Sequence, residues 1–198
     1  MIFPKECLRR CFQIFRGDQT DDAFLERVVA AIPARADGSA STGGPYDVII
    51  DDGSHHPAHQ LASFRFLFLR GLAAGGTYVI EDTETSYWEH SEGYGLDSMA
   101  GLPLDDIAYG LSHPLSTINV FRALAHITIN GDFLTPAMRE RHAKEHPGLD
   151  EAVPAEVRQR IATITFARNC VLVTKKEAAH DRFVSKWHRE ISHIASKH

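Results

Sequence analysis

The order of apolar and polar positions along this chain predicts an α/β domain. Residues 48–50 (VII) and 77–80 (TYVI) are short, continuous apolar runs, which is the pattern of parallel strands buried on both faces. Between these runs and after Pro57, apolar side chains recur at helical spacing, at Leu61, Phe64, Phe68 and Leu72. We expect Gly75-Gly76 to end this helix. A strand, a crossover helix and a second strand in succession place the two strands parallel.

The segment before this unit carries weaker signals. CFQIF, residues 11–15, predicts a short strand, and Asp21 or Asp22 is expected to cap a helix that runs to about Ile32. Residues 34–45 have the composition of a loop.

The second half of the chain predicts a long loop, several helices and a closing hairpin. Residues 83–114 show no period and are expected to form a functional loop or lid. A helix is expected over 115–129, followed by polar helical pieces over 136–160, broken at Pro147 and Pro154. Two antiparallel strands, residues 162–167 and 169–176, are expected to join around Arg168-Asn169. The polar segment from Ala178 predicts a helix, which is either solvated or an oligomer contact through Trp187.

Composition places the chain in the ordinary globular range. It has 198 residues, 43% of them apolar and 24% charged, which suits one domain, and we expect residues 1–198 to form it. A net charge of −5 argues against a general nucleic-acid binder. No apolar run approaches the roughly 20 residues of a membrane span. Three cysteines and no evident signal peptide favour a reduced, cytoplasmic protein.

Two acidic pairs, Asp51-Asp52 and Glu81-Asp82, directly follow the two predicted parallel strands. The carboxyl ends of parallel strands meet at one sheet edge, where open α/β sheets bind their ligands. Four carboxylates gathered there repel one another unless a cation or a proton lies among them. The pairs therefore mark a candidate site. The alternative is that these aspartates cap turns and helices, a role that suits Asp52-Gly53-Ser54.

Three motifs in fixed order carry a family resemblance: GDQTD at 17–21, DDGSH at 51–55 and IEDTETSYW at 80–88. With them the chain resembles the class I S-adenosylmethionine-dependent methyltransferases, and more narrowly the metal-dependent O-methyltransferases that act on macrolide sugars. The resemblance implies a Rossmann-like sheet with helices on both faces and an antiparallel closing hairpin. It also implies that S-adenosylmethionine and Mg²⁺ serve to methylate a hydroxyl of a sugar or polyketide-like small molecule.

The resemblance also implies roles for individual residues. The Mg²⁺ ligands would be Asp52, Glu81 and Asp82. The general base would be His55. Hard oxygen ligands suit Mg²⁺, and a neutral histidine can take a proton at physiological pH. The alternatives are that His55 only begins a helix, or that His55 and His59 form a zinc pair at i, i+4 spacing.

The same resemblance implies binding residues around the metal. Asp18 and Gln19 lie where the adenine edge is bound, and we assign Asp51 to the cofactor site as well. Tyr87 and Trp88 fall in the segment that lines the acceptor pocket. The alternatives are an Asx turn at Asp18 and aromatic anchors that fix a loop to the core.

The chain departs from the family pattern at its N-terminus, where only ten residues precede Cys11 and no G-x-G motif occurs. We therefore expect a domain without the family's first strand and glycine-rich turn, with weak or absent cofactor affinity, in which His55 acts as base only when the chain is completed at its N-terminus. Residues 47–50 are then expected to expose an unpaired edge, which leaves the chain marginally stable or self-associating. Residues 11–15 are the segment that could pair with that edge. A non-catalytic interaction module and a metal-dependent hydrolase remain as alternative functions.

Overall fold

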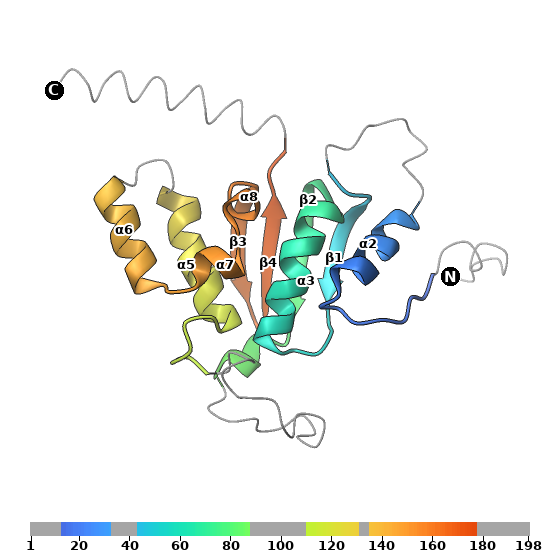
Figure 1. Cartoon of the computed structure of the whole chain (residues 1–198), viewed down its shortest axis with the longest axis horizontal. Helices are drawn as coiled ribbons and strands as arrows, with labels where there is room; N and C mark the ends of the chain where they lie inside the picture. Colours follow the sequence, from blue (N-terminus) through green and yellow to red (C-terminus); the bar gives the residue numbers. More distant parts are fainter. Residues whose placement is uncertain (1–12, 33–42, 88–109, 131–134, 178–198) are drawn as a thin grey trace.

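The computed structural model describes residues 13–32, 43–87, 110–130 and 135–177, which form a mixed α/β fold (Figure 1). The predicted α/β class is confirmed. Its sheet has the strand order β1-β2-β4-β3. β1 (Tyr46–Asp51) runs parallel to β2 (Leu72–Glu81), and β4 (Cys170–Lys175) pairs antiparallel with both β2 and β3 (Ile161–Ala167). Both the predicted parallel unit and the predicted closing hairpin are present.

Helix α3 (Pro57–Arg70) connects the parallel strands and supplies much of the core. Proline fits its first turn, where no intrahelical partner is needed for the missing N–H. Phe64 and Phe68 are fully buried. The Phe64 ring meets Tyr78 of β2 and Phe121 edge-on, at centroid distances of 5.2 and 5.1 Å. Burying a side chain of this size contributes about 1.5–3 kcal/mol, so this aromatic cluster fixes α3 against the sheet.

Helix α5 (Thr117–Asn130) brings Phe121 into that core. The hairpin closes the core from the other side, where the Nζ of buried Lys175 donates to the carbonyl oxygens of Leu72 and Leu69 at 2.6 and 3.0 Å. Burial lowers the pKa of Lys175 to about 8. A lysine at this position ties β4 to the last turn of α3, through Leu69, and to the first residue of β2, Leu72.

The remaining helices lie where the sequence places them. Helix α2 (Asp22–Ala30) begins after Asp21, whose side chain accepts from the backbone N–H of Ala23. The polar pieces form three helices: α6 (Pro136–Glu145), α7 (Leu149–Ala152) and α8 (Ala155–Arg158). None of the described helices is long and apolar enough to cross a membrane. The expected tail helix from Ala178 and most of the 34–45 loop fall outside the described residues.

Two expectations about element boundaries are wrong. Gly75-Gly76 does not end α3, because the helix stops at Arg70 and both glycines lie inside β2. Gly76 approaches the sheet so closely that an added Cβ would lie 2.8 Å from the carbonyl oxygen of Asp47. Residues 13–15 of the predicted first strand are not a strand, and Ile14 is 95% exposed. No described strand pairs with residues 13–15, and an apolar run alone does not form a strand without such a partner.

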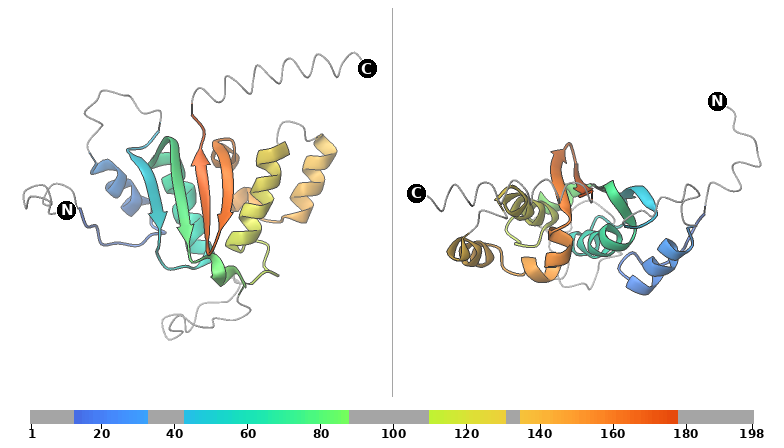
Figure 2. Two further views of the ribbon diagram at one scale, coloured as in Figure 1. Left: turned by 180° about the vertical axis from the view of Figure 1, so that it is seen from behind. Right: turned by 90° about the horizontal axis from the view of Figure 1, so that it is seen from above.

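One face of the β1–β2 pair is open within the described part of the chain. Figure 2 shows α3 on one side of these strands and no described helix on the other. Val48 and Ile50 alternate with the core-packed Ile49 and are 57% and 59% exposed, so the expected burial of β1 on both faces is wrong. Helices were predicted on both faces of the sheet. Among the described residues, they cover one face of the β1–β2 pair. β1 also ends the sheet, with β2 as its one described neighbour.

Candidate metal and catalytic site

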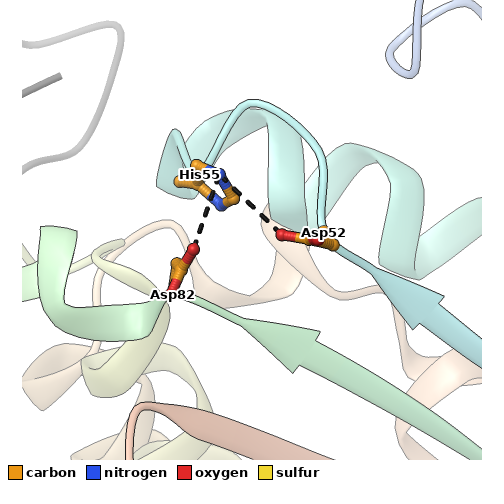
Figure 3. Close-up of side chains that lie close together, drawn as sticks. All are labelled: Asp52, His55 and Asp82. Atoms are coloured by element: carbon orange, nitrogen blue, oxygen red, sulfur yellow. Dashed lines mark ion pairs between the residues drawn. The ribbon is translucent and has the colours of Figure 1, made fainter.

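The two acidic pairs meet at the carboxyl edge of β1 and β2, as the parallel arrangement predicts. Three side chains come together there: Asp52 and His55 from the turn after β1, and Asp82 directly after β2 (Figure 3). The His55 Nε2 atom lies 3.6 Å from Asp82 Oδ2 and 4.0 Å from Asp52 Oδ1. One ligand atom from each residue lies within 4.8 Å of the others, a grouping that could hold a metal ion.

The predicted ligand Glu81 is not part of this group. Because strand side chains alternate, Glu81 lies on the face opposite Tyr78 and Ile80, which are buried beneath α3. Its backbone carbonyl accepts from the buried side chain of Gln60 at 2.9 Å. Gln60 also accepts from the Thr117 hydroxyl at 2.6 Å, which ties the end of β2 to α3 and α5.

Unusual backbone conformations occur at the same edge of the sheet. His55, Asp82 and Asn169 are the non-glycine residues with positive φ in the described chain, at 58°, 51° and 57°. Such values are uncommon outside glycine, although Asn, Asp and His adopt them more readily than other residues. All three residues lie within one connected set of side chains, and strained positions of this kind cluster at functional sites.

Asn169 is the residue of this set that sequence analysis missed as a site residue. It lies at the turn between β3 and β4, and its Nδ2 donates to Asp82 Oδ1 at 2.7 Å. Its Oδ1 accepts from the backbone N–H of Glu84 at 3.0 Å, and its carbonyl accepts from the N–H of Thr83 at 3.2 Å. The closing hairpin thereby fixes the segment that carries Asp82. The sequence signalled only a turn at this position.

Asp51 differs from its neighbour Asp52, because its carboxylate points inward. It is 9% exposed and accepts hydrogen bonds from Ser63 of α3 at 2.5 Å and Tyr78 at 3.0 Å. Burial raises the pKa of Asp51, and the hydrogen bonds from Ser63 and Tyr78 oppose this effect. These contacts make Asp51 an anchor between β1, β2 and α3, and its assignment to the cofactor site stays a prediction.

Asp18 and Gln19 hold a turn beside the site. The Asp18 carboxylate accepts from the backbone N–H and the hydroxyl of Thr20, both at 2.8 Å, which is an Asx-type turn. The hydrogen bond donated by the Thr20 backbone N–H is the main reason that the pKa of Asp18 is lowered. Gln19 Oε1 accepts from the backbone N–H of Ser54 at 2.8 Å. The same Gln19 oxygen lies so close to Gly53 that a Cβ added to Gly53 would overlap with it. Adenine contact by both residues stays a prediction.

The alternative zinc pair is not assembled. His59 Nδ1 lies 2.9 Å from the Ser54 hydroxyl, and the His59 ring stacks on His56 with centroids 4.8 Å apart. His59 is not a member of the group around His55.

A pocket of about 660 Å³ adjoins the site on the hairpin side. Its lining includes Tyr87, Arg122, Phe166 and Asn169. Tyr87 belongs to the short 3-10 helix η1 (Thr83–Tyr87), which begins the predicted lid, and it is 57% exposed. Trp88 and the rest of the lid up to residue 109 fall outside the described residues. A role for Tyr87 and Trp88 in acceptor binding stays a prediction.

Known proteins resemble this chain over limited stretches. L-olivosyl-oleandolide 3-O-methyltransferase of Streptomyces antibioticus is 48% identical over 85 residues, which are 43% of this chain and 18% of that protein. Mycinamicin VI 2''-O-methyltransferase of Micromonospora griseorubida is 45% identical over 73 residues, 37% of this chain and 15% of that protein. The chain thus spans about a fifth or less of the curated relatives that it matches. No protein-family model matches the sequence.

A solved structure agrees with these relatives. The MycE methyltransferase of the mycinamycin biosynthetic pathway, in complex with Mg, SAH and mycinamycin VI, superposes with a TM-score of 0.52 at 27% identity. The match covers 82% of this chain and 31% of that one. The resemblance to metal-dependent sugar O-methyltransferases is thereby confirmed, as is the class I methyltransferase-like fold.

Proposed function

We propose that this chain carries the metal and base site of an S-adenosylmethionine- and Mg²⁺-dependent O-methyltransferase whose acceptor is a hydroxyl of a sugar or polyketide-like small molecule. The observation that carries the proposal is the convergence of Asp52, His55 and Asp82 at one sheet edge. The relatives named for sugar O-methylation and the structure solved with Mg and SAH support it.

The residues at this edge fit a hard divalent cation. Asp52 and Asp82 offer carboxylate oxygens, the ligands that Mg²⁺ prefers. Their side chains are 62% and 30% exposed, so a partly hydrated ion has access to both. Asp52 and Asp82 would hold the ion, and Glu81 would join them by a change of side-chain rotamer, as the resemblance implies. Bound there, Mg²⁺ would make the proton of a nearby hydroxyl more acidic.

His55 then acts as the general base. Its Nε2 faces the two carboxylates, so it is placed to accept the proton of an acceptor hydroxyl brought to the same edge. S-adenosylmethionine, when bound, would supply the methyl group, and the acceptor oxygen would replace its sulfur on the methyl carbon, leaving S-adenosylhomocysteine. The part of this chain in that step is the acceptance of the hydroxyl proton at His55 Nε2. The imidazolium then loses the proton to water.

Residues 1–198 form one methyltransferase-like unit in this proposal, and residues 83–114 are the lid over the acceptor. The partner is the small-molecule acceptor, in a cytoplasmic protein without nucleic-acid or membrane partners. Homo-oligomer formation is an outcome to measure by light scattering.

Calorimetric titration with S-adenosylhomocysteine, with and without Mg²⁺, tests the proposal. We expect weak binding that strengthens when Mg²⁺ is present and that is weakened further in the Asp82→Asn variant. Mg²⁺ binding without any affinity for S-adenosylhomocysteine would support the hydrolase instead. Binding of neither ligand would overturn the proposal and favour a non-catalytic interaction module.

A further inference from the structure

We propose that Asn169 restricts Asp82 to one free carboxylate oxygen and so gives this site a preference for Mg²⁺ over Ca²⁺. The inference rests on the proposed function, because it requires a cation at Asp82. It assigns a positioning role to a residue that lies 87 positions away in the sequence and in a different part of the sheet.

The orientation of the Asn169 amide follows from its partners. The backbone N–H of Glu84 can only donate, so the amide atom 3.0 Å from it must be the oxygen. The Nδ2 group therefore faces Asp82, where it donates to Oδ1 at 2.7 Å. Asp82 Oδ2 points the other way, toward His55 Nε2 at 3.6 Å. Each oxygen of this carboxylate has a different neighbour, and Oδ2 is the one that faces His55, a member of the group that could hold a metal ion.

The two cations respond differently to such an arrangement. Mg²⁺ requires a near-ideal octahedron of oxygens, and two oxygens of one carboxylate lie too close together to fill two of its positions well. Ca²⁺ accepts six to eight ligands and binds carboxylates through one or both oxygens. A donor held on Oδ1 keeps Asp82 in the one-oxygen mode that suits Mg²⁺. Without the donor, Oδ1 becomes available to the larger ion.

Turn geometry alone does not account for Asn169. Its φ of 57° is satisfied by glycine at least as well, and the Arg168–Asn169 turn needs no side chain at this position. The side chain instead uses both its donor and its acceptor on the segment that carries Asp82. This difference provides a matched variant, because Asn169→Gly keeps the turn and removes only the amide.

The test measures the Mg²⁺ and Ca²⁺ dissociation constants of the 198-residue chain by calorimetry, for the parent, Asn169→Gly and Asn169→Asp. Asp tolerates the same backbone conformation and can still accept from Glu84, but it cannot donate to Asp82. In both variants we expect the ratio of Mg²⁺ to Ca²⁺ affinity to fall by about tenfold, the size of effect that outer-shell partners of metal ligands have. The ratio is unaffected by a general loss of stability, which melting curves record separately.

The outcomes separate this inference from the function on which it rests. If the parent binds Mg²⁺ and Asp82→Asn weakens that binding by about tenfold or more, but both Asn169 variants keep the parental ratio within twofold, the positioning role is wrong and the metal site stands. If the parent binds neither cation, the metal site and the inference fall together. If Asn169→Gly does not fold, Asn169→Asp decides the result.

Discussion

The two acidic pairs at the ends of β1 and β2 look alike in the sequence, but the strand-end residue of each pair points to a different face of the sheet. In the first pair, Asp51 is the last residue of β1 and points under α3, while Asp52 lies beyond the strand and is exposed. In the second pair, Glu81 is the last strand residue and faces away from α3, while Asp82 turns into the site. In both pairs the residue just past the strand reaches the candidate metal position.

The two ends also differ in how they are held. The β1 end is anchored through its own carboxylate, since Asp51 accepts from Ser63 and Tyr78. The β2 end is anchored from outside, because Gln60 binds the Glu81 carbonyl and Asn169 binds Asp82. The site is therefore assembled from one strand end that is fixed by a buried acid and another that is fixed by the closing hairpin.

The largest expected effect is on turnover. If His55 is the base of the site, His55→Ala should lower kcat by roughly 10²- to 10⁴-fold in a methyl-transfer assay of a chain that also carries the family's glycine-rich turn. S-adenosylhomocysteine affinity should change little. His56→Ala is the matched control, because His56 stacks on His59 and is not in the group with Asp82. A loss of less than about threefold for His55→Ala would leave His55 as a helix-entry residue.

The next effect is on the cation. Asp82→Asn removes one charge at nearly constant shape and should weaken Mg²⁺ binding by at least about tenfold in a calorimetric titration, since a ligand contributes no less than the outer-shell groups that orient it. Asp47→Asn makes the same charge change at the opposite end of β1 and should have little effect. Equal affinities for the parent and Asp82→Asn would refute the assignment of Asp82.

The third prediction compares the contributions of Glu81 and Asp82 to Mg²⁺ binding. Its side chain lies outside the group in the described structure, so Glu81→Gln should weaken Mg²⁺ binding by less than Asp82→Asn does, by roughly threefold to tenfold. The same titration compares the two variants directly. Equal losses would show that Glu81 is as full a ligand as the resemblance implies.

The smallest effect concerns Asp51 and stability. Burial raises the pKa of Asp51, so the folded protein keeps this proton to a higher pH than the unfolded chain does. The stability that this proton contributes is complete below the unfolded pKa and is lost as the pH rises through the folded pKa. Urea denaturation at several acidic pH values should therefore show the parent losing stability relative to Asp51→Asn as the pH rises. A difference that does not depend on pH would contradict a raised pKa.

The sequence predicted the parallel unit, the closing hairpin and the edge where the site lies, because these follow from local periodicity and strand direction. It failed where tertiary contacts decide. Gly75 and Gly76 look like a helix end, but they lie within β2, in the irregular stretch between Leu72 and Thr77, which pair with Tyr46 and Val48 of β1. The role of Asn169 depends on a contact across 87 residues, which no local pattern reveals. The inward orientation of Asp51 could not be predicted, because residues 48–50 are all apolar, and only the structure shows that Ile49, on the same face as Asp51, packs against the core.

The most direct test of the metal site is a crystal structure of the chain grown with Mn²⁺ in place of Mg²⁺, with anomalous differences measured to locate the ion. The account predicts one anomalous peak between Asp52 and Asp82, within ligand distance of Asp82 Oδ2, with Asn169 still bonded to Oδ1. A peak on His56 or His59, or no peak at the ends of β1 and β2, would contradict it.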